Sequence, residues 1–187
     1  MDEPIRSVIE TPRLRLREMT LADVDFVAGM LADPAVMRFY PKIYSRREAE
    51  EWVLKQRMRY RDHGHGLWLA VEATTREPVG QVGLVRQEVE GRPEEEIGYL
   101  LAASCWGRGY ATEAARATRD HAFRVLRKDR VISLIRPENV PSQRVAQRID
   151  FTVRSRTLFG GFEHLVFGME RSQWLPLADP PVHGRVT

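Results

Sequence analysis

The sequence predicts an α+β fold in which one mixed, mostly antiparallel sheet of seven strands is flanked by helices. Its expected elements follow the order strand, two helices, three strands, helix, strand, helix, two strands. Short turns join the three central strands, as in an antiparallel meander. Strands and helices do not alternate, so a dinucleotide-binding fold with a parallel sheet is disfavoured.

The first strand and the first two helices follow from local patterns. Residues 14–17 alternate apolar and polar side chains, which indicates a half-buried strand. Thr20 and Asp23 have the spacing of a capping box, and Ser45 is the expected cap of the second helix. We therefore expect a strand at 14–17 and helices at about 20–33 and 47–61.

The remaining elements complete one sheet. Apolar runs separated by turns predict strands at 67–73, 79–88 and 95–101. A long helix after Gly109 is expected to bury a face that includes Val125 and to expose Arg119. A right-handed crossover makes the next strand, 131–135, parallel to the strand that ends at Leu101. A short helix at 142–148 and paired strands at 151–158 and 164–171 follow.

Composition narrows the class of protein. The chain has 187 residues, a net charge of +3 and one cysteine, which excludes an intrachain disulfide. No apolar run approaches the ~18 residues of a membrane span, and no signal-peptide pattern opens the chain, so we expect a cytoplasmic protein. We expect one domain over 1–175 and a loose tail over 176–187. We also expect a monomer or homodimer without a nucleic-acid partner.

A glycine-rich turn is the most informative local feature. Gly107-Arg108-Gly109 follows an apolar strand and directly precedes a helix. The first N–H groups of a helix lack intrahelical acceptors, and the helix dipole is positive at that end. The turn therefore predicts a ligand that carries phosphate and is held by main-chain N–H groups.

Four segments in order resemble the GNAT superfamily of acetyl-CoA-dependent N-acetyltransferases. They resemble most the branch with the ribosomal-protein N-terminal acetyltransferases RimJ and RimL. Trp106 to Ala111 stands where the superfamily has Gln/Arg-x-x-Gly-x-Gly/Ala. The other segments are Thr11 to Arg17, Leu31 to Phe39, and Asn139-Val140-Pro141-Ser142 through Asp150-Phe151.

The resemblance implies that acetyl-CoA donates an acetyl group directly to a primary amine, within a ternary complex. The pyrophosphate would lie on the turn and the pantetheine arm along the strand edge, in a splay between the fourth and fifth strands. The implied coenzyme A-binding residues are Tyr99, Leu100, Leu101, Trp106, Gly107, Arg108, Gly109, Tyr110, Ala111, Thr112, Asn139 and Ser142.

Three residues are candidates for the chemistry. An amine must lose a proton to attack a thioester, and Glu96 is the candidate base. The N–H of Leu101 is the candidate oxyanion donor, and Ser142 the candidate acid for the leaving thiolate. The family's pattern is not kept throughout. Ala146 stands where many members have a tyrosine that acts as general acid. Trp106 replaces Gln or Arg, and Asp150 stands where the pattern has glycine.

Several alternatives stay open at this stage. Glu94, Glu95 and Glu96 could be a charged strand start, or could attract a cationic acceptor. His63 and His65 lack a third ligand at useful spacing, so we expect solvated histidines and no metal site. The acceptor could be a protein N-terminus, a polyamine, an aminoglycoside or another small amine. Its pocket could be bordered by Phe39, Tyr40 and Tyr44, or these side chains could only pack against the rest of the protein. A non-catalytic acyl-CoA-binding module on the same fold is the competing function.

Overall fold

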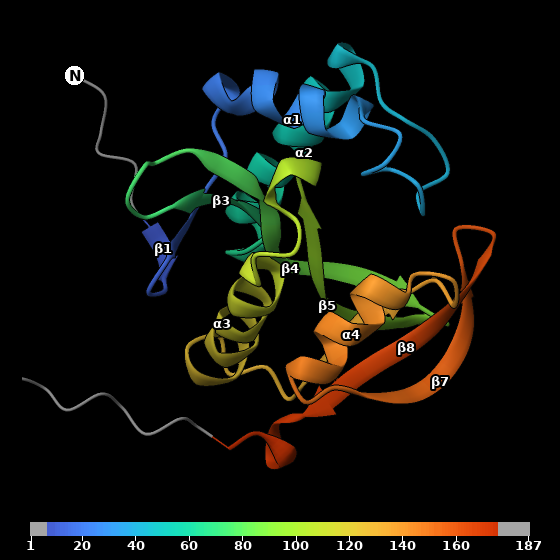
Figure 1. The fold of residues 1–187 in the computed structure, drawn as a ribbon. Coiled ribbons are helices and arrows are strands. Elements are labelled where there is room, and N and C mark those ends of the chain that lie inside the picture. The colour runs from blue at the N-terminus through green and yellow to red at the C-terminus, as the bar shows by residue number, and fades with distance from the viewer. Residues whose placement is uncertain (1–6, 176–187) are drawn as a thin grey trace, which may run out of the picture.

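The structure, a computed structural model, describes residues 7–175; the expected tail at 176–187 lies outside that range. An eight-stranded sheet in the order β1-β2-β3-β4-β5-β6-β8-β7 forms its centre (Figure 1). The strands are β1 (Ser7–Glu10), β2 (Leu14–Arg17), β3 (Leu67–Glu72), β4 (Pro78–Val89), β5 (Arg92–Leu101), β6 (Arg130–Ile135), β7 (Thr152–Phe159) and β8 (Phe162–Glu170). The helices are α1 (Val24–Ala32), α2 (Arg46–His63), α3 (Tyr110–Arg124) and α4 (Val140–Arg148).

The predicted α+β class and mixed sheet are confirmed, with one strand more than expected. The additional strand, β1, pairs with β2 at the edge of the sheet. Its four residues contain no alternation of apolar and polar side chains, so only the pairing with β2 reveals it. All pairings in the sheet are antiparallel except that of β5 with β6, which is parallel as the crossover rule predicts.

The predicted caps fix the starts of the first two helices. Asp23 Oδ2 accepts a hydrogen bond from Thr20 N at 2.7 Å, and one 3₁₀ turn then leads into α1. Ser45 N donates to Glu48 Oε2 at 2.8 Å, while the Ser45 hydroxyl accepts from Glu48 N. This reciprocal pair satisfies two amides that lack helical acceptors, so α2 begins one residue earlier than expected.

Each face of the sheet has its own helical layer. The helices α1 and α2 pack on one face against Leu67, Leu69 and Val85. The helix α3 packs on the other face, where Ile97 and Leu101 join the larger core cluster. Figure 1 shows α3 and α4 side by side on that face, with α1 and α2 beyond the sheet. Because side chains alternate along a strand, the two faces of β5 meet different environments.

Two surface assignments on α3 were wrong. Val125, expected in the apolar face, is 60% exposed, because the helix ends at Arg124. Arg119, expected in solvent, is only 4% exposed and ion-pairs with Asp120 and Asp150. A buried guanidinium needs such partners. Phe123, which the sequence reading did not include, is fully buried one helical turn after Arg119.

Candidate active site

The exposed edge of β5 is the centre of the candidate site. Backbone polar groups along a strand point alternately to its two neighbours. Ala102 N donates to Val79 O of the β4 side at 3.0 Å, whereas Ile97 O accepts from the Ser133 hydroxyl of β6 at 2.8 Å. By this alternation, the N–H groups of Tyr99 and Leu101 face β6. The backbone of Leu100 faces β4, so its amide is used inside the sheet.

The strands β5 and β6 separate just where those N–H groups begin. Their only register pair in the described sheet is Glu96 with Ile132. Side chains bridge the next residues, because Glu96 Oε1 accepts from Leu134 N at 3.4 Å and Ser133 Oγ donates to Ile97 O. The splay was expected between the fourth and fifth of seven strands. These are β5 and β6 here, because β1 was not among the expected strands.

Glu96 lies at the base of this splay with a second hydrogen-bond donor. Gln87 Nε2 of β4 donates to Glu96 Oε2 at 3.0 Å. Burial raises the pKa of the Glu96 carboxyl above its ordinary value, while the hydrogen bonds from Gln87 and Leu134 and the nearby Arg59 cation act in the opposite direction. A carboxyl with a raised pKa binds a proton more readily, which suits a general base.

Residues on α4 close the other side of the splay. The Tyr99 hydroxyl reaches across from β5 and donates to the Ser142 carbonyl at 2.7 Å. Asn139 Oδ1 accepts from Ser142 N at 3.2 Å, so this atom caps α4 and only its amide nitrogen is free for a ligand. The main chain of Ser142 is thus held on both sides. Its hydroxyl has no hydrogen-bond partner within residues 7–175 and is free to meet a ligand.

The N-terminus of α3 presents unpaired amides beside the same edge. Glu113 N donates to Gly109 O at 3.1 Å, which leaves the amides of Tyr110, Ala111 and Thr112 without an intrachain acceptor in the described chain. Gly109 has φ = +81° and Gly107 φ = +74°, and both are exposed. The left-handed conformation favours glycine, and the missing Cβ lets an anion approach the amides.

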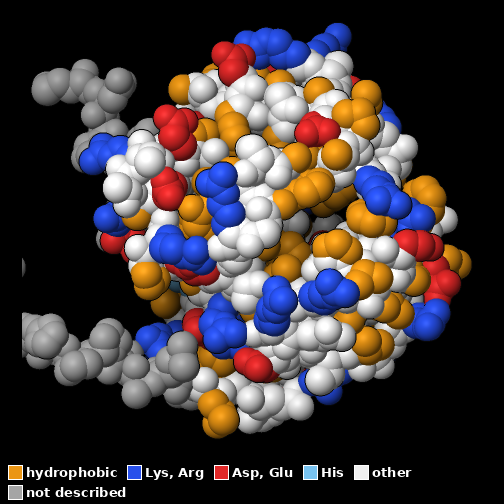
Figure 2. Space-filling model, in the orientation of Figure 1, with side chains coloured by type: hydrophobic (Ala, Val, Ile, Leu, Met, Phe, Trp, Pro, Cys, Tyr) orange, Lys and Arg blue, Asp and Glu red, His pale blue; other side chains and the backbone are white. Residues whose placement is uncertain are grey.

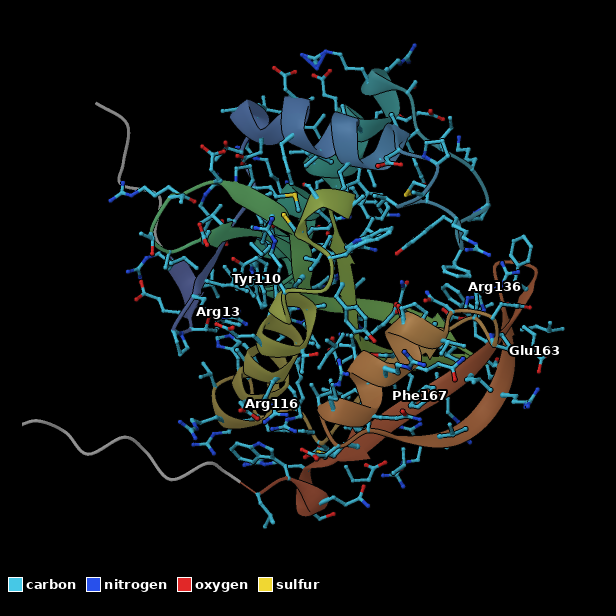
Figure 3. The ribbon with its side chains drawn as sticks, in the orientation of Figure 1. Arg13, Tyr110, Arg116, Arg136, Glu163 and Phe167 are labelled. Carbon is cyan, nitrogen blue, oxygen red and sulfur yellow. The ribbon has the colours of Figure 1, made fainter. Side chains whose placement is uncertain are left out.

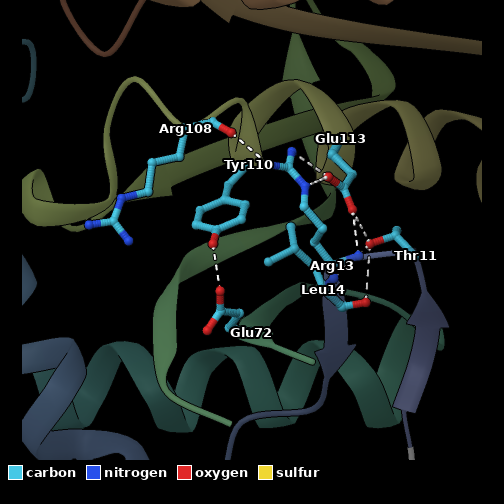
Figure 4. A network of polar contacts seen from close by, with 7 residues as sticks. All are labelled: Thr11, Arg13, Leu14, Glu72, Arg108, Tyr110 and Glu113. Carbon is cyan, nitrogen blue, oxygen red and sulfur yellow. Dashed lines mark hydrogen bonds and ion pairs between the residues drawn. The ribbon is translucent and has the colours of Figure 1, made fainter. Parts of the chain in front are cut away.

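A polar network anchors this turn to the N-terminal strand (Figure 4). Arg13 donates to the Arg108 carbonyl at 2.9 Å and pairs with Glu113 Oε2 at 2.6 Å. Thr11 Oγ1 donates to the other Glu113 oxygen at 2.6 Å. Arg13 also lies 4.9 Å from the centre of the Tyr110 ring, and Figure 3 shows the two side by side at the start of α3. Sequence reasoning missed this role, since 100 residues separate Arg13 from Glu113.

Two aromatic residues of the turn have structural partners. Trp106 Nε1 donates to Leu101 O at 2.9 Å, which ties the turn to the end of β5. The Tyr110 side chain is buried and its hydroxyl donates to Glu72 Oε1 at 2.8 Å, so only the Tyr110 amide can face a ligand. The Arg108 side chain is exposed and points away from Arg13 and Glu113, on the side of Tyr110 and Glu72 (Figure 4).

The loop between α1 and α2 approaches the splay from the face of the sheet opposite to α3. Tyr40 is 41% exposed, so it is only partly buried. Partial burial raises its pKa, and the charges of Glu96 and Tyr44 act in the same direction. Tyr44 instead packs edge-on against Trp52, with ring centres 6.0 Å apart. Figure 2 shows a hollow lined by hydrophobic side chains on this side of the molecule, with basic side chains around it. Of the two tyrosines, Tyr40 is the one whose charge interacts with that of Glu96.

His65 is not the solvated residue that the sequence suggested. It is 2% exposed, and its ring lies 2.9 Å from Leu84 O and 3.4 Å from Glu95 Oε2. Burial lowers the pKa of His65. The Leu84 carbonyl and the Glu95 carboxylate thus lie next to its two ring nitrogens.

Residues 13–152 match the family model described as the acetyltransferase (GNAT) domain. The match spans the splayed strands, the amides of α3 and the start of α4. The chain belongs to the GNAT acetyltransferase family. Members of this family carry out acyl transfer and use acetyl-CoA, and the unpaired amides at α3 and along β5 are the groups that phosphate and thioester oxygens require.

Relatives and solved structures agree with this membership. The protein YkkB of Bacillus subtilis, itself uncharacterized, is 39% identical over 145 residues, which cover 77% of this chain and 84% of YkkB. An acetyltransferase of Agrobacterium tumefaciens is 28% identical, with a TM-score of 0.77 over 91% of this chain and 97% of its own. RimL, a ribosomal alpha-N-protein acetyltransferase solved with coenzyme A, shares the fold at 18% identity, with a TM-score of 0.71 over 88% and 98% of the two chains.

No helix within residues 7–175 combines the length and apolarity needed to cross a bilayer.

Proposed function

We propose that this GNAT protein transfers the acetyl group of acetyl-CoA directly to a primary amine while both substrates are bound. One observation carries the proposal: the amide edge of β5 has the unpaired amides of a helix terminus on one side and Glu96 on the other. Donor and acceptor can therefore approach the same edge from opposite faces of the sheet. Such an arrangement places the two reactants together without a covalent enzyme intermediate.

The proposed roles follow from position. The amides of Tyr110 to Thr112 bind pyrophosphate oxygens, and the edge groups of Tyr99 pair with the pantetheine arm. The Leu101 N–H donates to the thioester carbonyl oxygen and stabilises its developing negative charge. Arg108, exposed beside the turn, supplies a positive charge for phosphate.

Proton transfer uses one group on each side of the splay. Glu96 accepts the proton of the attacking amine, directly or through one water molecule, so that the nitrogen lone pair can form the amide bond. The carbon–sulfur bond breaks as that bond forms. Ser142, whose hydroxyl is free, donates a proton to the leaving thiolate directly or through water. Ala146 is fully buried and its methyl group has no acidic proton, so this residue cannot take the role.

The RimJ/RimL branch supplies the narrower hypothesis that the acceptor is a protein N-terminal amine. The likeness to RimL is one of fold, and RimL itself is described as a ribosomal alpha-N-protein acetyltransferase. The segments Thr11 to Arg17 and Leu31 to Phe39 favour this branch over others. A peptide N-terminus would enter from the side of Tyr40, whose charge interacts with that of Glu96.

A thiol-release assay with acetyl-CoA against a panel of amines tests the proposal. The panel contains N-terminal peptides, free amino acids, a polyamine and an aminoglycoside. We expect coenzyme A release that depends on both substrates, with intersecting lines when the two concentrations are varied. Binding of acetyl-CoA without turnover on any amine would instead support a non-catalytic acyl-CoA-binding module. Absence of a thermal shift with acetyl-CoA would contradict both functions.

A further inference from the structure

The two ends of α4 are attached to the rest of the protein in different ways. At the C-terminal end, α3 provides two bonds. Arg119 Nη1 donates to Ile149 O at 2.8 Å, and Arg116 Nη2 donates to Arg148 O. The first turn of α4, which carries Ser142, is attached to β5 instead.

One side-chain hydrogen bond makes this second attachment. The Tyr99 hydroxyl donates to Ser142 O at 2.7 Å. The other side-chain bonds of the turn are local. Asn139 Oδ1 accepts from Ser142 N and caps the helix, and Gln143 Nε2 donates at 2.8 Å to Pro137 O in the loop before it. Within residues 7–175, the Tyr99 bond is therefore the only hydrogen bond that ties the first turn of α4 to the sheet.

This bond crosses the splay where the sheet no longer holds its two sides together. Glu96 and Ile132 form the only register pair between β5 and β6 in the described sheet, and Tyr99 lies beyond it along β5. Tyr99 and Leu101 occupy alternate positions of the strand, so their side chains share a face and their N–H groups share an edge. The Tyr99 bond therefore links the strand of the proposed oxyanion donor to the residue whose hydroxyl is free, Ser142.

The Tyr99 hydroxyl is a permanent donor in this bond. A carbonyl oxygen can only accept, so the proton belongs to Tyr99 for as long as the bond exists. Burial raises the pKa of Tyr99, and the charges of Glu96 and Tyr40 act in the same direction, so the hydroxyl stays protonated at neutral pH. Tyr99 is thus suited to holding Ser142 in place and not to giving up a proton itself.

We propose that Tyr99 is a positioning residue, whose bond to Ser142 O holds the Ser142 hydroxyl opposite the Leu101 N–H so that one thioester can meet both groups. This inference rests on the proposed function, in which Ser142 protonates the leaving thiolate. The bond acts through the main chain of Ser142, whose carbonyl keeps its helical bond to the Ala146 amide when the tyrosine hydroxyl is removed. Loss of that hydroxyl should therefore loosen the first turn without unfolding α4. A misplacement of about 1 Å can lower a rate about 10²-fold.

A double-mutant cycle tests whether Tyr99 acts through Ser142. Tyr99→Phe keeps the ring that packs against the larger core cluster, and we expect kcat to fall about tenfold while the KM for acetyl-CoA changes less. In the Ser142→Ala background the same substitution should have little further effect, because both residues serve one proton transfer. Tyr60→Phe is the matched control. Its hydroxyl donates to Leu67 O in the core, so the substitution should lower stability and leave kcat unchanged.

The thiol of bound coenzyme A gives a readout that needs no turnover. The ultraviolet absorbance of the thiolate, followed against pH, reports the pKa of this thiol in the complex. A hydroxyl that donates to the sulfur favours the thiolate, so we expect the pKa to be lower in the wild-type complex than for free coenzyme A. Ser142→Ala should remove most of this shift, Tyr99→Phe should remove part of it, and the double variant should resemble Ser142→Ala.

The outcomes separate this inference from the proposed function. A thiol pKa that responds to Ser142→Ala and not to Tyr99→Phe would overturn the inference and leave Ser142 as the acid. A pKa that responds to neither would contradict both roles. Additive effects of the two substitutions on kcat would show that Tyr99 acts on binding or stability alone, which also overturns the inference.

Hydrogen exchange in the free protein tests the attachment itself. The Ala146 amide donates to the carbonyl that Tyr99 holds, and we expect it to exchange about two- to tenfold faster in Tyr99→Phe, the equivalent of one neutral hydrogen bond. Amides at the C-terminal end of α4, where Arg119 binds, should be unaffected. Unchanged exchange at Ala146 would overturn the inference even if the protein bound no coenzyme A.

Discussion

Trp106 Nε1 donates a hydrogen bond of 2.9 Å to the carbonyl oxygen of Leu101. The bond joins the glycine-rich turn to the end of β5, which are the proposed phosphate-binding and thioester-binding parts of the site. Trp106 stands at the Gln/Arg position of the superfamily pattern, where loss of a donor to the ligand was expected. Its indole N–H instead holds the carbonyl group of Leu101, and the N–H of the same residue is the proposed oxyanion donor.

Trp106→Phe tests this coupling. The variant keeps an aromatic ring and removes the indole N–H, so the Leu101 peptide loses one restraint. A neutral hydrogen bond contributes about 0.5–1.5 kcal/mol, and we expect kcat/KM for acetyl-CoA to fall about two- to tenfold. Trp174→Phe removes a similar indole bond, to Asp120 at 2.8 Å, and should leave this value unchanged. Equal effects of the two substitutions would count against the coupling.

Gly109→Ala should weaken acetyl-CoA binding beyond its effect on stability. A Cβ at φ = +81° strains the backbone by about 1–2 kcal/mol and projects beside the amides of α3. We expect the KM for acetyl-CoA to rise about tenfold, the cost of one charge-assisted hydrogen bond.

Gly91→Ala is the matched control, because Gly91 has φ = +73° in the turn between β4 and β5. Urea denaturation should show a similar loss of stability in both variants, whereas only Gly109→Ala should change the KM. A KM increase of the same size in Gly91→Ala would mean that destabilisation alone explains the result.

Glu96→Gln should remove the pH dependence that the base imposes. The carboxylate must be ionised to accept a proton, and burial raises its pKa, so wild-type kcat/KM should fall as pH drops through a range above that of an ordinary Glu, about 4.3. The variant should lose about 10²- to 10⁴-fold where the amine is protonated, and less at a pH where the free amine dominates. Glu94→Gln, beside Arg130, is the control. An unchanged pH profile in Glu96→Gln would exclude the assigned role.

The same substitution has an opposite consequence for stability. A carboxyl whose pKa is raised in the folded state binds its proton more tightly there than in the unfolded chain. Its favourable contribution is present at low pH and is lost as pH rises through the folded-state pKa. Neutral Glu96→Gln should therefore be at least as stable as wild type at pH 7, and its advantage should disappear in acid. Thermal unfolding at a series of pH values measures this difference.

Local chemistry made much of this fold predictable from the sequence. The Ser45–Glu48 capping box acts over three residues, and the glycine turn before α3 fixes both a backbone conformation and a helix start. The strands of the meander follow from the spacing of turn residues. In each case the deciding interactions lie within a few residues of one another.

Contacts between distant segments decided the rest. Arg13 and Glu113 bind each other across 100 residues, and no local pattern distinguishes them from solvated charges. Burial of Arg119 and His65 likewise depends on which neighbours the sheet brings to them.

Asp150 combines backbone strain with a long-range ion pair, and the two can be separated by substitution. Its φ of +65° is the left-handed conformation in which the family pattern has glycine. Its carboxylate oxygen Oδ2 accepts from Arg119 Nη1 at 2.8 Å, which helps to neutralise that buried guanidinium. Asp150→Gly relieves the strain and loses the ion pair. Asp150→Ala loses the ion pair but keeps the Cβ, so the backbone strain remains and no side-chain hydrogen bond offsets it.

We expect Asp150→Ala to be the less stable of the two variants by about 1 kcal/mol, as is typical for a non-glycine residue in this conformation. Asp150→Asn, which tolerates the conformation and keeps a hydrogen-bond acceptor for Arg119, should lie closest to wild type. Urea denaturation of the three proteins beside wild type gives the order. Equal stability of the alanine and glycine variants would contradict the assumed backbone strain at position 150. The ion pair with Arg119 would then be the remaining reason for an aspartate there, since 69% of its side chain is exposed.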